Sequence, residues 1–206
     1  VLFDYDVQTS SYGRNIETPL QLQALTANLQ RRATSPLLIA VDQEGGQVCR
    51  LKAEQGFPAL ASARELGRAD DPVATHQAAQ ATALNLAAAG INLNLAPTVD
   101  LDINPDNPVI GAKQRSYSAD PDRVVAHAAA FIRAHHAHSV ACTLKHFPGH
   151  GSSRHDSHLD LVDVSRTWSE QELLPYRPLI DAGLADAVMT AHVFNEHLDP
   201  DFPATL

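Results

Sequence analysis

Residues 140–151 read Val-Ala-Cys-Thr-Leu-Lys-His-Phe-Pro-Gly-His-Gly, and residues 152–158 continue as Ser-Ser-Arg-His-Asp-Ser-His. The first five residues form a short apolar run bounded by turn residues, which predicts a buried strand. A proline and two glycines then prevent a helix from following. Polar side chains crowd the end of this strand, as they do in α/β active sites. We therefore expect the chemistry of the protein to lie here.

The composition is that of an ordinary globular domain. The chain has 206 residues, of which 44% are hydrophobic and 19% charged, enough to bury a sizeable core. A net charge of -9 argues against nucleic acid as a partner, because no basic surface is available to neutralise phosphates. No apolar run is long enough to cross a bilayer, so no membrane partner is expected. Nothing in the composition implies a cofactor.

The two cysteines, Cys49 and Cys142, lie far apart and in different expected elements. They form neither a disulfide framework nor a metal-ligand spacing, which mildly favours a reducing compartment. The sequence opens in what reads as the middle of a strand, without a methionine. We therefore expect a chain that is cut at both ends.

Strands and helices alternate along the chain. Apolar runs predict strands at 1–5, 37–41, 91–97, 140–144 and 187–193. Thr18-Pro19, Asp71-Pro72 and Asp120-Pro121 each combine a capping residue with a proline at the first helical position, which predicts three helix starts. Ser169 and Glu172 have capping-box spacing, and the prolines that follow predict a helix that is kinked or in two pieces.

This alternation predicts a parallel sheet covered by helices, either a barrel or a doubly wound sheet. No GxGxxG or GxxxxGK[ST] loop follows any strand, so the usual signature of open-sheet nucleotide folds is missing. Asp42, Lys145 with His146, and His192 follow or end three different strands. A barrel collects its site from many strands, whereas an open sheet uses one switch point. The barrel is favoured.

Four histidines, His146, His150, His155 and His158, fall within 13 residues. They occupy an irregular loop without HExxH or another zinc pattern, so hydrogen bonding or catalysis is favoured over a metal site. Asp156 can accept the imidazole N–H of His158, fix its tautomer and leave the other nitrogen to transfer protons. A solvated loop pair is the alternative for those two residues. No GxSxG motif supports a serine hydrolase.

The 145–151 and 156–158 blocks together resemble the glycoside hydrolase family 3 β-N-acetylhexosaminidases of the NagZ type, which are cell-wall recycling enzymes. Three further blocks, at 38–46, 94–100 and 188–193, agree with the family and lie in its order. The likeness covers nearly the whole of residues 1–206, as a partial N-terminal barrel domain. It implies an α/β fold, a (β/α)₈ TIM-type barrel that is incomplete, with about five of the eight strands.

The resemblance also implies roles for single residues. His158 is the expected general acid/base and Asp156 orients it. The residues expected to bind the terminal N-acetylglucosamine are Asp42, Arg50, Arg115, Lys145, His146 and His192. Carboxylate acceptors and cationic donors fixed at strand ends suit the recognition of sugar hydroxyls. The implied substrate is a muropeptide that contains N-acetylglucosamine, with neither cofactor nor metal.

The sequence departs from the family in one respect. A retaining glycosidase needs a nucleophile as well as an acid/base. The family's nucleophile is an aspartate in an Ile-Ser-Asp-Asp-Leu-like block, and no such block occurs here. The chain by itself is therefore expected to be inactive.

The leading function is hydrolysis of terminal β-N-acetylglucosamine from peptidoglycan fragments, with retention and in the cytoplasm. Phosphorolysis at the same site is one alternative, because a histidine acid/base repels incoming phosphate less than a carboxylate does. A sugar-binding fragment without catalysis is the other. The oligomeric state is left open by the sequence.

Overall fold

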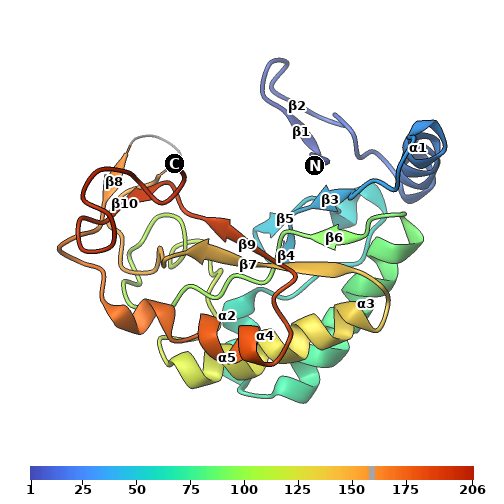
Figure 1. The fold of residues 1–206 in the computed structure, drawn as a ribbon. Helices are drawn as coiled ribbons and strands as arrows, with labels where there is room; N and C mark the ends of the chain where they lie inside the picture. Colours follow the sequence, from blue (N-terminus) through green and yellow to red (C-terminus); the bar gives the residue numbers. More distant parts are fainter. Residues whose placement is uncertain (158–160) are drawn as a thin grey trace.

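A computed structural model describes residues 1–157 and 161–206. Four parallel strands lie side by side at its centre, in the order β3 (Ala40–Val41), β6 (Leu93–Asn94), β7 (Ala141–Phe147) and β9 (Ala187–Thr190) (Figure 1). Because their order in space follows their order in sequence, the chain winds in one direction, without the reversal of a doubly wound sheet. The predicted barrel class is confirmed, and the described residues form an open arc of such a barrel.

The helices α2 (Ala63–Ala69), α3 (Pro72–Ala88), α4 (Pro121–His136) and α5 (Tyr176–Asp181) lie on one side of this sheet (Figure 1). Helix α1 (Pro19–Arg32) precedes β3. The three predicted caps are present: Thr18, Asp71 and Asp120 each accept backbone N–H groups at the start of their helix. Each following proline occupies a position where no N–H is needed. No helix in the described ranges is long and apolar enough to cross a membrane.

The core lies between the helices and the sheet. One cluster joins Phe131 and Ile132 of α4 to Cys142 and Leu144 of β7. A second cluster brings α1, through Leu22, and α3 against β3, and a smaller one joins Val162 and Val164 to Ala191 and Val193. This one-sided burial leaves the carboxyl ends of the strands and the loops that follow them free to form a site.

Outside the central sheet, the described residues form three two-stranded sheets. The structure pairs β1 (Tyr5–Asp6) with β2 (Ser11–Tyr12), β4 (Gln43–Gly45) with β5 (Val48–Cys49), and β8 (Val162–Asp163) with β10 (Val193–Phe194). Two 3-10 helices, η1 (Ala53–Gln55) and η2 (Glu170–Leu173), are also present in the described part of the chain.

The strand predicted at 1–5 is wrong as a regular strand. Leu2 donates its N–H to the carbonyl of Ala40 at 2.8 Å, which places the segment beside β3. Phe3 then exchanges hydrogen bonds with Asn15 instead of β3, and the chain turns into the β1–β2 hairpin. Since each backbone group bonds once in a ladder, pairing with Asn15 removes Phe3 from the sheet.

The predicted capping box at Ser169 is also wrong. Ser169 makes no side-chain cap bond, and a 3-10 turn replaces the expected helix start. The Glu172 side chain points to the 149–153 turn and accepts hydrogen bonds there. The prediction of two helical pieces is confirmed by η2 and α5.

Candidate active site

A pocket of about 340 Å³ opens where the strands end. Parallel strands bring their carboxyl ends to one edge, so residues distant in sequence meet there. Asp42 directly follows β3, Lys145 and His146 lie in the last part of β7, and His192 lies two residues after β9. All six residues predicted to bind the sugar line this pocket: Asp42, Arg50, Arg115, Lys145, His146 and His192. Their roles in binding remain predictions.

Lys145 is a buried cation, with only 1% of its surface exposed. Its Nζ lies 2.9 Å from Oδ1 of Asp42 and 2.6 Å from Oε1 of Glu44. A buried ammonium is tolerated only when carboxylates replace its lost water. These two bonds leave one of its three N–H donors for another acceptor.

Glu44 connects Lys145 to a second cation. Arg115 donates to it twice, from Nε at 2.9 Å and from Nη2 at 2.7 Å. Burial alone would raise the pKa of the Glu44 carboxyl, but the Lys145 ammonium and the Arg115 guanidinium outweigh it and hold that pKa well below its ordinary value. Glu44 is therefore ionised, and it fixes both cations at the pocket wall. No role was predicted for Glu44, and its one signal in the sequence is its place two residues after Asp42.

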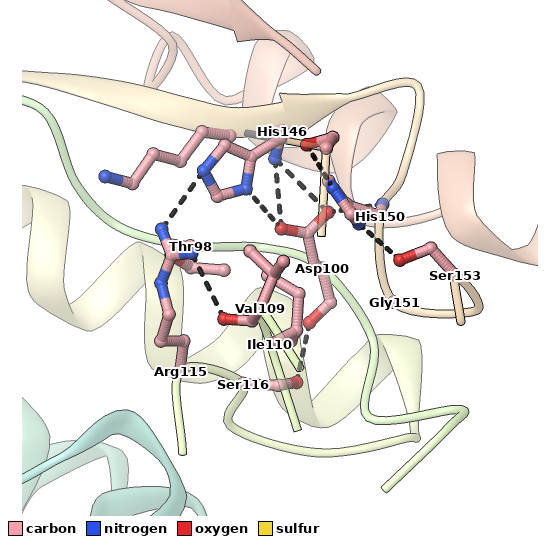
Figure 2. Close-up of polar contacts among 12 residues, drawn as sticks. Thr98, Asp100, Val109, Ile110, Arg115, Ser116, His146, His150, Gly151 and Ser153 are labelled. Atoms are coloured by element: carbon pink, nitrogen blue, oxygen red, sulfur yellow. Dashed lines mark hydrogen bonds and ion pairs between the residues drawn. The ribbon is translucent and has the colours of Figure 1, made fainter. Parts of the chain in front are cut away.

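The His146 imidazole lies between a carboxylate and a guanidinium. Its Nδ1 lies 2.6 Å from Oδ2 of Asp100, and its Nε2 lies 3.1 Å from Nη2 of Arg115 (Figure 2). A guanidinium can only donate, so Nε2 accepts and Nδ1 carries the proton. Burial lowers the pKa of His146 to about 4, because Asp100 offsets the cost of burying an imidazolium only in part. His146 is consequently neutral near pH 7.

Asp100 is the hub of these contacts (Figure 2). Its fully buried carboxylate accepts the N–H of His150 at 2.8 Å and that of His146 at 3.2 Å, in addition to the imidazole. Burial would raise the pKa of Asp100, but the contacts with His146 and the N–H of His150 hold it below its ordinary value. Asp100 ends the third expected strand and the 94–100 block that agrees with the family, but its role as the partner of His146 and His150 was not predicted.

Arg50 also lines the pocket and lies close to two carboxylates. Its Nη2 lies 3.5 Å from Oδ2 of Asp42, and its Nη1 lies 3.9 Å from the buried Asp4. Asp4 in turn pairs with Lys52 at 2.9 Å. The amino-terminal segment before the β1–β2 hairpin thus helps to place Arg50.

The predicted acid/base pair is described only in part. Asp156 lies half-buried in the loop after β7, whereas His158 lies outside the described residues. Ser157, between them, bonds to the imidazole Nε2 of His150 at 2.7 Å. Within residues 1–157 and 161–206, no three His, Cys, Asp or Glu side chains gather as metal ligands.

Residues 4–206 match the Glycosyl hydrolase family 3 N terminal domain. The chain belongs to glycosyl hydrolase family 3. A β-hexosaminidase of Tolumonas auensis is 43% identical over 199 residues, which cover 94% of this chain and 57% of the relative. A β-hexosaminidase of Pseudomonas aeruginosa is 42% identical over 196 residues, covering 92% and 56%. The chain thus spans less than three fifths of these family 3 relatives.

Solved family 3 structures share the fold. A family 3 β-N-acetylglucosaminidase from Paenibacillus sp. str. FPU-7 superimposes with a TM-score of 0.86 and 41% identity, covering 93% of this chain and 37% of that one. NagZ from Neisseria gonorrhoeae, in complex with N-trifluoroacetyl-D-glucosamine, gives a TM-score of 0.82 and 36% identity, with coverage of 90% and 56%. The pocket described above therefore belongs to a family 3 barrel.

Proposed function

We propose that this protein removes terminal β-N-acetylglucosamine from peptidoglycan fragments, as a retaining β-N-acetylhexosaminidase. The convergence of all six expected sugar-binding residues on one pocket carries the proposal. The names of the β-hexosaminidase relatives, and the glucosamine derivative bound to the Neisseria gonorrhoeae NagZ, support the substrate class.

The pocket has the chemistry that a hydroxyl-rich ligand needs. Asp42 is 16% exposed and offers carboxylate oxygens to sugar hydroxyls, while the spare N–H of Lys145 donates to a hydroxyl oxygen. Because the ion pairs with Glu44 already fix Lys145 and Arg115, little ordering remains when the sugar binds. Neutral His146 adds a planar, uncharged wall.

His158 protonates the leaving group in this proposal, and Asp156 orients its imidazole. The test uses the complete protein and two β-N-acetylglucosaminides, one with an alkyl and one with a 4-nitrophenyl aglycone. We expect His158→Ala to reduce kcat/KM for the alkyl glycoside by about 100- to 10,000-fold and for the aryl glycoside far less, because 4-nitrophenolate leaves without protonation. His155→Ala, at an exposed histidine three residues earlier, is the control and should change neither. Equal losses on both substrates would contradict the acid/base role.

The same assay separates the alternatives. Faster turnover in phosphate buffer, with a sugar phosphate as product, would indicate phosphorolysis. Sugar binding without turnover in either buffer would indicate a binding protein. A cytoplasmic location is also proposed, supported by two free cysteines, and cell fractionation tests it.

A further inference from the structure

Glu172 is a buried carboxylate outside the pocket, with 1% of its surface exposed. It lies in η2, beneath the turn that follows β7. Its Oε2 accepts the N–H of Gly151 at 2.8 Å and that of Ser152 at 3.4 Å, and its Oε1 accepts the Ser152 hydroxyl at 2.5 Å. A carboxylate that accepts several N–H and O–H bonds from one turn fixes the course of that turn.

The turn is packed directly onto this carboxylate. Gly149 has φ +126°, and a Cβ there would lie 2.5 Å from Cβ of Glu172. A Cβ on Gly151 would lie 1.9 Å from the carbonyl oxygen of Leu101. Both positions therefore require glycine, one for its backbone angle and both for the close approach. Trp168, just before η2, adds a bond from Nε1 to the carbonyl of Pro148 at 3.0 Å.

A second buried carboxylate, Asp100, binds backbone N–H groups beside the same turn. Asp100 accepts the N–H groups of His146 and His150. Asp100 and Glu172 thus divide between them the N–H groups at 146, 150, 151 and 152. Two buried carboxylates from different parts of the chain therefore hold the backbone of this turn by hydrogen bonds.

The His150 side chain connects the turn to residues that follow it in the sequence. Its Nδ1 lies 2.6 Å from Oγ of Ser153, and its Nε2 lies 2.7 Å from Oγ of Ser157. Ser157 directly follows Asp156 and directly precedes His158 in the sequence. Hydrogen bonds at both ends, joined by the backbone of the 149–153 turn, therefore connect Glu172 to the residue between the two members of the predicted acid/base pair.

We infer that Glu172 is a positioning residue for acid/base catalysis, which it supports by anchoring the 149–153 turn and, through His150, the segment at 156–157. The inference rests on the proposed function, because the pair it positions is the proposed acid/base. Glu172 itself is not among the described residues that line the pocket.

Glu172→Gln is the informative variant. Burial raises the pKa of Glu172 to about 7, so a neutral side chain of the same shape costs the fold little. The amide oxygen can still accept from the N–H groups of Gly151 and Ser152, and the NH₂ group can donate to the Ser152 hydroxyl, so the anchor bonds persist as weaker, neutral hydrogen bonds. Glu170→Gln makes the same chemical change at an exposed position of η2 and serves as the matched control. Ser152→Ala removes the hydroxyl bond from the side of the turn.

Hydrogen exchange followed by mass spectrometry tests the anchor without any substrate. We expect peptides that cover residues 147–157 to exchange about 3- to 10-fold faster in Glu172→Gln, because hydrogen bonds to a neutral amide are weaker than those to a carboxylate, while α4 peptides are unchanged. Ser152→Ala should act in the same direction and more weakly, and Glu170→Gln should not differ from the parent. Unchanged exchange at 147–157 in both variants would overturn the inference.

Kinetics test the positioning. For Glu172→Gln we expect kcat/KM for the alkyl glycoside to fall by about 10- to 100-fold, carried by kcat, and for the 4-nitrophenyl glycoside by less than about threefold. An equal loss on both substrates would show a merely structural role and overturn the inference. A parent protein that is inactive on both substrates would instead refute the proposed function, and the exchange comparison would still decide whether Glu172 anchors the turn.

Discussion

Replacing Lys145 with methionine tests whether the buried charges at the pocket wall depend on one another. Lys145→Met keeps the length and apolar stem of the side chain but removes the charge that faces Asp42 at 2.9 Å and Glu44 at 2.6 Å. Removing one partner of a buried ion pair costs about 3 to 5 kcal/mol, because the other charge stays buried. Glu44 keeps Arg115 and Asp42 keeps Arg50, so we expect the lower end, about 3 kcal/mol.

Urea unfolding of the complete protein measures this cost. With a denaturant slope of about 2 kcal/mol per molar, a loss of about 3 kcal/mol lowers the midpoint by about 1.5 M. Lys113→Met is the control, at a half-buried lysine that lines the same pocket, and should change stability by less than about 0.5 kcal/mol.

A double-mutant cycle isolates the pair. Glu44→Gln removes the charge that Lys145→Met leaves uncompensated, so the double variant should be less destabilised than the sum of the single variants, by about 1 to 3 kcal/mol. Strict additivity, or a Lys145→Met midpoint equal to that of Lys113→Met, would refute the reasoning.

Two further predictions concern pH and close packing. The pKa of His146 is lowered from 6.5 to about 4 in the folded protein, so the unfolded chain binds more protons between those pH values, and the free energy of unfolding should fall as the pH drops from about 6.5 to 4. His146→Gln should remove about one proton from this pH dependence, measured by urea unfolding at several pH values, and an unchanged dependence would contradict the prediction. Gly151→Ala places a Cβ 1.9 Å from the carbonyl oxygen of Leu101, a backbone atom, and should lower the free energy of unfolding by more than about 3 kcal/mol, as measured by thermal unfolding. Gly183→Ala, with no neighbour within 4 Å, should cost only its backbone strain of about 1 to 2 kcal/mol, and equal costs would argue against the close contact.

The elements of the barrel were predictable because their signals are local. A capping residue followed by proline marks a helix start whatever surrounds it, and Thr18, Asp71 and Asp120 all cap as expected. The apolar run before Lys145 needs only its own residues to be read as a buried strand. The predictions at Phe3 and Ser169 were wrong because of contacts with distant residues. Phe3 bonds to Asn15, and Glu172, three residues after Ser169, bonds to the 149–153 turn.

The site divides in the same way. The family resemblance predicted six pocket residues, four of which also follow or end strands, and the fold brings all six to one cavity. The roles of Asp100 and Glu44 were not predicted, because nothing in their local sequence indicates that they are buried or which side chains they contact.

The sequence by itself determined the alternation of strands and helices, the strand ends at which polar groups collect, and the family resemblance. Only the tertiary structure decided which charges become partners. Lys145 and Asp42 are 103 positions apart, and Arg115 and Glu44 are 71 apart. Ion pairs become strong where burial removes water, and burial depends on how helices and strands pack in space. Glu172 illustrates the difference: its spacing predicts a helix cap, whereas packing turns its carboxylate to the loop that leads to His158.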